Sequence, residues 1–332
     1  MSKRNQVTIR DIAKQVNMTT ITVSRALNHP EKVKPSSLEK ILKAVDELNY
    51  VPNAFAKNLK SKSSNIIGVV TDSIDNPFYA EMIKSVSREA KSHNYSIMLF
   101  DTDGVEELEM RAVETLLGYN VAGILLSPIL DNLTYRPSYI DKLIRHHMPV
   151  VMVDRVLYDT PFSRVVLNNM DSGYQMGRHL MAQNIRRILI ISGPMSSPIS
   201  KNRLAGFLKA VEESGKVLDY DVVYADYTMN PAYDKALHYL KYHEIPDAIL
   251  GINELITLGA MKAVRDFDLE DRNVLVAGVS QLPYAEIYGI TYPTIAHDPT
   301  MTGVKAMELL FQEMNSGDNE TKEVVIDGKL QV

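Results

Sequence analysis

Residues 8–27, TIRDIAKQVNMTTITVSRAL, constrain the fold of this chain more than any other stretch. Four apolar residues recur at helical spacing and form one stripe on a short helix: Ile9, Ile12, Ala13 and Val16. A second helix is predicted to begin near Thr19 or Thr20, whose hydroxyls can accept from the open backbone donors of its first turn. Its inward residues are Val23, Ala26 and Leu27, and its outward residues are Thr20, Ile21, Thr22 and Arg25. Two short helices with a tight turn and a third helix behind them predict a helix-turn-helix, whose second helix enters the major groove of DNA.

A third helix follows directly. Ser36 and Glu39 form a predicted capping-box pair ahead of apolar residues at helical spacing: Leu38, Ile41, Leu42, Val45 and Leu48. The pattern alone leaves open an all-helical docking module without a DNA role. Charge favours DNA, because residues 1–62 carry 12 Lys and Arg against 5 Asp and Glu, a net charge of +7. Since the whole chain carries −5, the other 270 residues carry −12. A basic head on an acidic body is typical of a domain that binds phosphate groups.

Residues 7–61 resemble the DNA-binding head of the lactose-repressor (LacI/GalR) family of bacterial transcription regulators. The resemblance rests on T-V-S-R at 22–25, on the L-x-Y-x-P-N turn at 48–53 and on the A-x-x-L segment at 56–59. It continues through the body to about residue 315. It implies a homodimer whose two heads read the half-sites of a pseudopalindromic, double-stranded operator.

The segment 54–60 is predicted to be a short hinge helix after the turn at 49–53. An isolated helix of this length is marginal in water, so we expect it to fray in the free protein and to order on DNA. The resemblance implies that Leu59 is a wedge in the minor groove, with Lys60 beside it and Lys57 near phosphate. The alternative is a plain interdomain linker.

The outward face of the second helix supplies the predicted base contacts, Thr20, Ile21 and Arg25. Arg25 can bond a guanine in a bidentate manner, which is worth about 1–3 kcal/mol of discrimination, and Ile21 can contact a thymine methyl. The predicted DNA-binding set comprises Thr8, Thr19, Thr20, Ile21, Thr22, Ser24, Arg25, Asn28, Asn53, Ala56, Lys57, Leu59 and Lys60.

From residue 66 onward, short apolar runs alternate with amphipathic stretches, which predicts an α/β body of two doubly wound parallel sheets. The predicted strands are 66–71, 95–100, 121–127 and 149–153 in one series, and 165–167, 188–192, 222–224, 248–251 and 274–278 in the next. The helices predicted between them are 78–92, 106–118, 138–146, 172–183, 202–214, 232–242 and 254–266.

The body resembles the periplasmic sugar-binding fold, in which the chain crosses between two lobes three times, and we place crossings near 155–165 and 279–295. The predicted domains are 1–52 (helix-turn-helix), 53–65 (hinge helix and linker) and 66–332 (effector binding and dimerisation), with lobe 1 at about 66–160 and 295–326 and lobe 2 at about 161–294.

The cleft between such lobes binds small ligands at strand ends and helix N-termini. The predicted effector-binding residues are Asp72, Asn76, Phe78, Tyr79, Arg155, Arg203, Asn253 and Ser280. Arg155 is included as a polar residue near a strand end, and the others stand at positions that the resemblance implies. The aromatic pair can stack on a sugar, and the planar guanidinium group of Arg203 can hold hydroxyls or a carboxylate. Asp101, Asp103 and Asp154 are further polar candidates near strand ends.

The cleft also departs from the sugar-binding pattern of the family. Three positions where aspartate is usual hold Asn168, Glu254 and Ser280. Each charge-assisted hydrogen bond lost from a polyol site is worth about 1.5–3 kcal/mol. These departures leave several alternatives open: the cleft binds a phosphorylated ligand such as a sugar phosphate or a less hydroxylated one, binds a sugar through other groups, senses a protein partner or a non-sugar metabolite, or binds nothing. The segment 149–155 and Ser192-Gly193-Pro194 look most like the ribose and related pentose repressors.

The sequence contains no phosphate-binding loop, zinc-protease helix or nucleophile elbow, and its eight histidines are scattered. We therefore expect no enzyme, no cofactor and no metal site. Without an apolar run of about 18 residues or a signal peptide, we expect a cytoplasmic protein with no membrane partner. The end of the chain at Val332 favours a dimer over a tetramer. A sugar-binding or transport receptor would share the body but would have no use for the basic head. The hypothesis is thus a transcriptional regulator, a repressor of a carbohydrate-use operon.

Overall fold

The computed structural model of the chain describes residues 7–50, 64–269, 273–315 and 320–332. Internal contacts divide the chain into two compact units, Met1–Ser64 and Asn65–Val332, which we call the head and the body. Each unit is described by itself.

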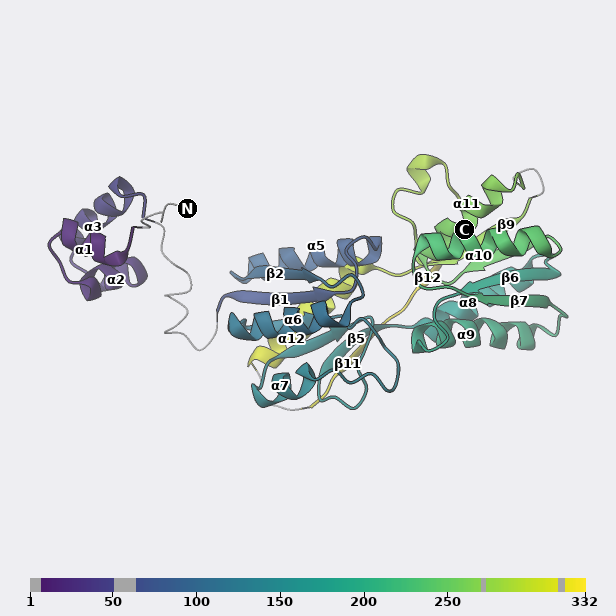
Figure 1. The fold of residues 1–332 in the computed structure, drawn as a ribbon, viewed down its shortest axis with the longest axis horizontal. Helices are drawn as coiled ribbons and strands as arrows, with labels where there is room; N and C mark the ends of the chain where they lie inside the picture. Colours follow the sequence, from purple (N-terminus) through teal and green to yellow (C-terminus); the bar gives the residue numbers. More distant parts are fainter. Residues whose placement is uncertain (1–6, 51–63, 270–272, 316–319) are drawn as a thin grey trace. The chain divides into compact units, whose positions relative to one another are not determined.

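The head is a three-helix unit (Figure 1). It contains α1 (Ile9–Gln15), α2 (Thr20–Asn28), the short 3-10 helix η1 (Pro30–Lys32) and α3 (Pro35–Glu47). The apolar stripes predicted from the sequence meet in one core, whose buried members are Ile12, Ala13, Val23, Ala26, Ile41 and Ala44. The prediction of three helices around one small core is confirmed.

The predicted capping box of the third helix is wrong. The N-cap of α3 is Lys34, and Ser36 lies inside the first turn because Pro35 already occupies the first helical position, where its fixed backbone angle suits a helix start. A capping pair lies instead on α1, where the backbone N–H of Thr8 donates to Asp11 Oδ2 at 2.8 Å and the Thr8 hydroxyl donates to the same oxygen at 2.7 Å.

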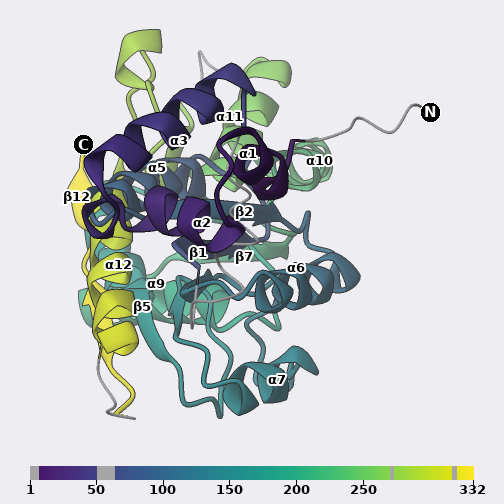
Figure 2. The ribbon, with the colours of Figure 1, turned by 90° about the vertical axis from the view of Figure 1, so that its left-hand side faces the viewer.

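The first lobe of the body contains a six-stranded sheet with the order β11-β5-β4-β3-β1-β2, parallel at every pairing. Its strands are β1 (Ile66–Thr71), β2 (Ser96–Asp101), β3 (Gly123–Leu126), β4 (Val150–Val153), β5 (Ser163–Leu167) and β11 (Glu323–Ile326). Its helices are α5 (Pro77–Ser92), α6 (Glu106–Gly118), α7 (Tyr139–Arg145) and α12 (Pro299–Asn315). Two separate apolar clusters form, one under α5 and α12 and one under α6 and α7, so helices cover both faces of the sheet (Figure 2).

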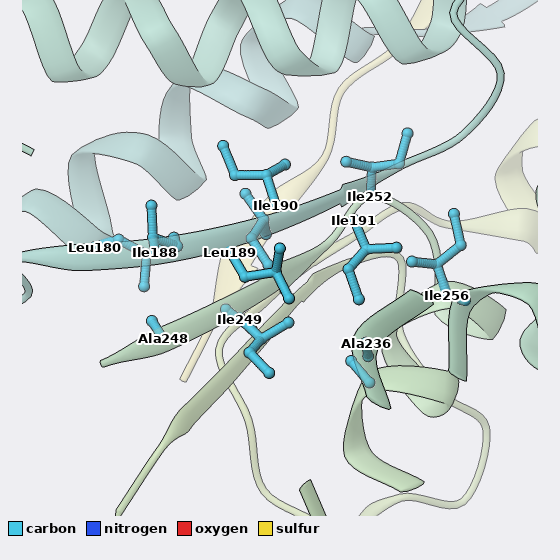
Figure 3. Close-up of a cluster of buried hydrophobic side chains, with 14 of the residues drawn as sticks. Leu180, Ile188, Leu189, Ile190, Ile191, Ala236, Ala248, Ile249, Ile252 and Ile256 are labelled. Atoms are coloured by element: carbon cyan, nitrogen blue, oxygen red, sulfur yellow. The ribbon is translucent and has the colours of Figure 1, made fainter. Parts of the chain in front are cut away.

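The second lobe contains a six-stranded sheet with the order β12-β10-β9-β8-β6-β7. Its strands are β6 (Arg187–Ser192), β7 (Asp219–Tyr224), β8 (Ala248–Gly251), β9 (Leu275–Val279), β10 (Thr294–Ala296) and β12 (Lys329–Gln331), of which only β12 is antiparallel to its neighbour among the described pairings. Its helices are α8 (Asn169–Ala182), α9 (Pro198–Ser214), α10 (Met229–Tyr242), α11 (Glu254–Asp266) and the short η3 (Glu286–Tyr288). Figure 3 shows how strand side chains such as Ile190 and Ile249 fill its core together with Leu180, Ala236 and Ile256 from the helices.

The chain crosses between the lobes after β5, after β10 and after β11, at residues 168, 297–298 and 327–328. The prediction that the strand at 165–167 opens the second lobe is wrong, because β5 pairs with β4 through Val151–Ser163 and Val153–Val165 in the first sheet. A buried strand has the same apolar pattern in either sheet, so the pattern cannot assign it. The three short strands β10, β11 and β12 were not predicted.

None of the helices within the described residues is long and apolar enough to cross a membrane.

Candidate functional site

The outer face of α2 is the exposed polar surface that the sequence predicted. Thr19 is the N-cap of this helix and accepts from the Thr22 N–H at 3.2 Å, while the two hydroxyls lie 2.9 Å apart. Thr20 and Arg25 are exposed, and Ile21 is 68% exposed. An apolar side chain this open at a helix N-terminus has no role in the core of the head, so it is available for contact with a partner.

Other predicted DNA-binding residues of the head also form hydrogen bonds that stabilise its helices. Ser24 and Thr22 are half-buried, and the Asn28 side chain donates to the Ser24 carbonyl at 2.9 Å. Thr8 is exposed at the start of α1, and its two hydrogen bonds lower the pKa of Asp11. The predicted hinge contacts Asn53, Ala56, Lys57, Leu59 and Lys60 lie outside the described residues.

The cleft between the lobes brings together side chains that follow strand ends or lie in the helices that begin there. A cavity of about 40 Å³ is lined by seven of the eight predicted effector residues: Asn76, Phe78, Tyr79, Arg155, Arg203, Asn253 and Ser280. Wider pockets of about 240 and 210 Å³ share lining residues with it on two sides. The inner volume suits one or two water molecules, so a sugar-sized ligand requires the lobes to separate about the crossings.

Arg155 of the first lobe reaches the second lobe at this cavity. It forms an ion pair with Asp72 Oδ2 at 2.7 Å, donates to the Ile129 carbonyl at 2.8 Å and lies 5.2 Å from the ring centre of Tyr227 in the second lobe. Asp72 therefore does not line the cavity but holds a residue that does. Burial raises the pKa of Asp72, and the Arg155 charge opposes that rise.

Arg203 is held by the N-terminus of α8 and by the end of β8. Its Nε donates to Asn169 Oδ1 at 2.8 Å and its Nη1 donates to the Ile252 carbonyl at 2.5 Å. The close approach of α8 and α9 makes these bonds possible. A Cβ atom on Gly173 would lie 1.9 Å from the Arg203 carbonyl oxygen, and one on Gly206 would lie 2.0 Å from that of Met170.

Of the predicted aromatic pair, only Phe78 offers a partly exposed ring. Tyr79 is buried, and its hydroxyl donates to Asp154 Oδ2 at 2.8 Å and lies 2.9 Å from the Ser127 hydroxyl. Asn76 and Asn253 act as helix N-caps, accepting from the N–H groups of Phe78 at 2.9 Å and Ile256 at 2.8 Å. These bonds fix the loops whose ends face the cavity.

The predicted effector set omitted five residues that line this cavity: Asp154, Leu167, Ile199, Tyr227 and Glu254. Asp154 was one of the further polar candidates, whereas Asp101 and Asp103 do not line it. Tyr227 follows β7 just as Arg155 follows β4, so the rule that cleft residues follow strand ends could have identified it. Asp154 and Ser280 both have left-handed backbones, with φ of 65° and 80°. Such conformations cost free energy for residues other than glycine and often occur at functional sites.

The crossings are joined by polar side chains close to this cavity. Asn168 Nδ2 donates to Asp327 Oδ1 at 2.8 Å, which links the first crossing to the third. Ser172 donates its only proton to the Asn168 carbonyl at 2.7 Å, so His297 of the second crossing must donate from Nε2 to Ser172 Oγ at 2.9 Å. Burial and the nearby Arg203 charge lower the pKa of His297 to about 3, which keeps the ring neutral.

Comparison with known proteins accounts for both units. Residues 8–53 match the family model "Bacterial regulatory proteins, lacI family", and residues 64–331 match "Periplasmic binding proteins and sugar binding domain of LacI family". The chain belongs to the LacI family. The resemblance found in the sequence is therefore confirmed, as is the fold class of a helix-turn-helix head with a body of two parallel-sheet lobes.

Individual LacI-family members match along nearly the whole chain. The ribose operon repressor of Escherichia coli (strain K12) is 28% identical over 92% of this chain and 93% of its own. Catabolite control protein A of Priestia megaterium is 28% identical over 93% of each chain. The crystal structure of the Lac repressor dimer bound to operator and the anti-inducer ONPF matches with a TM-score of 0.80 and 25% identity, over 99% of this chain and 98% of that one. The protein is thus a LacI-family transcriptional repressor with a DNA-binding domain and a body of the family's sugar-binding type. Because the chain is equally identical to two different regulators, the comparison does not single out a ribose regulator.

Proposed function

We propose that this LacI-family repressor binds a pseudopalindromic operator as a homodimer, in the cytoplasm, and that a small polyhydroxy effector in the cleft controls this binding. In this proposal residues 1–52 bind DNA, 53–65 link the units and 66–332 bind the effector and dimerise. The observation that carries it is the cavity at the ends of the parallel strands, where residues from both lobes converge. A ligand there contacts both lobes at once.

The head supports the DNA-binding part of the proposal. The exposed Thr20, Ile21 and Arg25 lie within the first two turns of α2, where a recognition helix contacts base edges. Arg25 specifies guanine, and Ile21 meets a thymine methyl. Cations of the head and hinge, Lys57 among them, contact phosphate and contribute affinity without sequence preference.

The cleft supports the regulatory part. An effector acts only through its different affinity for two arrangements of the lobes, and a hundredfold change in operator affinity requires about 2.7 kcal/mol of that preference. Contacts that already join the lobes at the cavity, such as Arg155 with Tyr227, break or form when the lobes move. An inducer favours the arrangement that releases the operator, and a corepressor favours the one that holds it.

Fluorescence anisotropy of the full-length protein on a symmetric operator with a central CG step tests the proposal. We expect tight binding that weakens with salt and with mutated half-sites, and that one sugar or sugar derivative changes at least about tenfold. Equal affinity for matched and scrambled sequences would refute the DNA-binding part. Specific binding that no small molecule changes would refute the effector part and favour a protein partner at the cleft.

A further inference from the structure

Two carboxylate oxygens at the cleft have no hydrogen-bond partner within the described part of the chain. Glu254 is 2% exposed, lines the cavity, and its Oε1 is buried and unpaired. Asp72 Oδ1, behind Arg155, is also buried and unpaired. A buried acceptor without a donor costs about 1–3 kcal/mol, and more when it is charged. A ligand with hydrogen-bond donors would therefore satisfy acceptors that the protein leaves unpaired in this cleft.

The two guanidinium groups at the cavity are already engaged by protein atoms. Arg155 bonds a carboxylate and a carbonyl and lies against an aromatic ring. Arg203 bonds an amide oxygen and a carbonyl oxygen. These bonds use Nη1 of Arg155 and Nε and Nη1 of Arg203. An anionic ligand such as a phosphate ester that approached the remaining N–H groups at the cavity would also approach the carboxyl groups of Asp154 and Glu254.

The balance of charge points in the same direction. Asp154 and Glu254 line the cavity together with Arg155 and Arg203, and Asp72 offsets the charge of Arg155 from behind. If all were ionised, these groups would carry three negative charges against two positive ones, and His297 beside them is neutral. Burial raises the pKa of all three carboxyl groups, so a positive charge on a ligand favours their ionised forms. Buried charges are tolerated where a counter-charge pairs with them. One positive charge on the ligand completes the set.

We propose that the effector carries a protonated amine, as an amino sugar does, and that Glu254 accepts a hydrogen bond from that ammonium group. This inference rests on the proposed function and specifies the chemistry of the same cleft. The sugar hydroxyls bond the remaining polar groups. The positive charge of the amine offsets the excess of carboxylates, whereas the negative charge of a phosphate would add to it. Glu254, which the sequence presents as a departure from the aspartate of sugar-binding relatives, is then the residue that selects the ligand.

Binding of an amine ligand should change the protonation of the Glu254 carboxyl group. Burial raises the pKa of Glu254, while Arg203 and the Ser280 hydroxyl oppose the rise. An ammonium group that binds the carboxylate lowers this pKa again, so an amine ligand releases a proton from Glu254 in the pH range where the free protein still holds it. A neutral sugar leaves the carboxyl group unchanged.

A structural role for Glu254 makes a different prediction. Glu254 is the first residue of α11, and a carboxylate there stabilises the helix through its dipole. If that were its only role, Glu254→Gln would lower the free energy of unfolding but would leave the relative affinities of neutral and amine ligands unchanged.

The experiment compares three amines, D-glucosamine, D-galactosamine and D-mannosamine, with their neutral parent hexoses and the hexose 6-phosphates. Binding to the full-length protein is measured by isothermal titration calorimetry at a series of pH values between 5 and 7.5, in two buffers of different ionisation enthalpy. We expect one amine to bind at least about tenfold more tightly than its parent, and the phosphates to bind least.

Glu254→Gln, which keeps the shape of the side chain, should abolish the preference for the amine, and Asp234→Asn, an exposed carboxylate on α10, should leave it unchanged. The amine assignment fails if a phosphate or a neutral hexose binds as tightly as the amine, if Glu254→Gln retains the preference, or if no amine binds. Operator binding in the anisotropy assay is recorded for the same samples. A neutral sugar that releases the operator refutes the amine alone, whereas loss of specific operator binding refutes the proposed function.

Discussion

The ion pair between Asp72 and Arg155 offers a quantitative test of how the cleft is held together. Their side chains are 14% and 10% exposed, and the two groups meet at 2.7 Å. Asp72→Asn removes the carboxylate bonded to a buried guanidinium group, and breaking such a pair from one side costs about 3–5 kcal/mol. We expect the lower end of that range, because the Ile129 carbonyl and the Tyr227 ring still contact Arg155.

Arg155→Met should cost less than Asp72→Asn, and the difference should grow as pH falls. The carboxyl group of Asp72 already has a pKa raised by burial, and without the guanidinium group it can take up a proton in place of remaining charged. The sign follows from linkage. The folded variant binds a proton that the unfolded chain lacks at the same pH, so its stability rises as pH falls from 7 toward the ordinary pKa of Asp.

The assay is urea unfolding of the full-length variants and the Asp72→Asn, Arg155→Met double variant, followed by circular dichroism at pH 5 and pH 7. We expect the double variant to be more stable than Asp72→Asn, because a neutral pair leaves no unpaired charge in the cleft. If the cost of the double variant equals the sum of the two single costs within about 0.5 kcal/mol, the groups do not interact and the reasoning is refuted.

Three further predictions concern the helix pair, the crossings and the head. Gly206→Ala places a Cβ atom 2.0 Å from a backbone oxygen of α8 and should cost at least about 1–3 kcal/mol in urea unfolding, whereas the control Gly118→Ala, which meets nothing within 4 Å, should not destabilise. The free energy of unfolding of His297→Gln should rise relative to that of the wild type as pH falls from 6.5 toward 3, by up to about 1.4 kcal/mol per pH unit. In that range only the unfolded wild-type chain binds a proton at this ring. Parallel curves of unfolding free energy against pH for the two proteins would contradict this. Arg25→Ala should lose about 1–3 kcal/mol on the matched operator and little on mutated half-sites in the anisotropy assay, while Lys43→Ala on α3 should keep the preference, and equal losses on both sequences would remove Arg25 from base recognition.

The sequence predicted most of the secondary structure because its apolar periodicity is strong. The predicted strands at 66–71 and 248–251 have the bounds of β1 and β8, and the helix at 254–266 has those of α11. The candidate cleft followed from the rule that ligands bind beyond the carboxyl ends of parallel strands. That rule needs only the strands and the polar residues that follow them.

What the sequence could not predict depends on contacts between distant segments. The sheet to which β5 belongs is decided by its pairing with β4, and no local pattern encodes that choice. Tyr79 has the pattern of a stacking residue, but its hydroxyl pairs with Asp154 from a different strand end. From the sequence, Glu254 was interpreted as the loss of an aspartate that binds ligand in relatives. Only its burial and its unpaired oxygen in the structure show that it is a carboxyl group without a partner.

The first turns of α8 connect the cleft to the crossings. Asn169 holds Arg203 in the cavity, and three residues later Ser172 accepts from His297 of the second crossing. Asn168, immediately before the helix, bonds Asp327 of the third crossing. Because these contacts share one rigid segment, a ligand that pulls Arg203 toward either lobe also moves the donors and acceptors that set the angle between the lobes. A substitution at Ser172, which lines neither the cavity nor the two wider pockets beside it, should therefore change the effector response in the anisotropy assay.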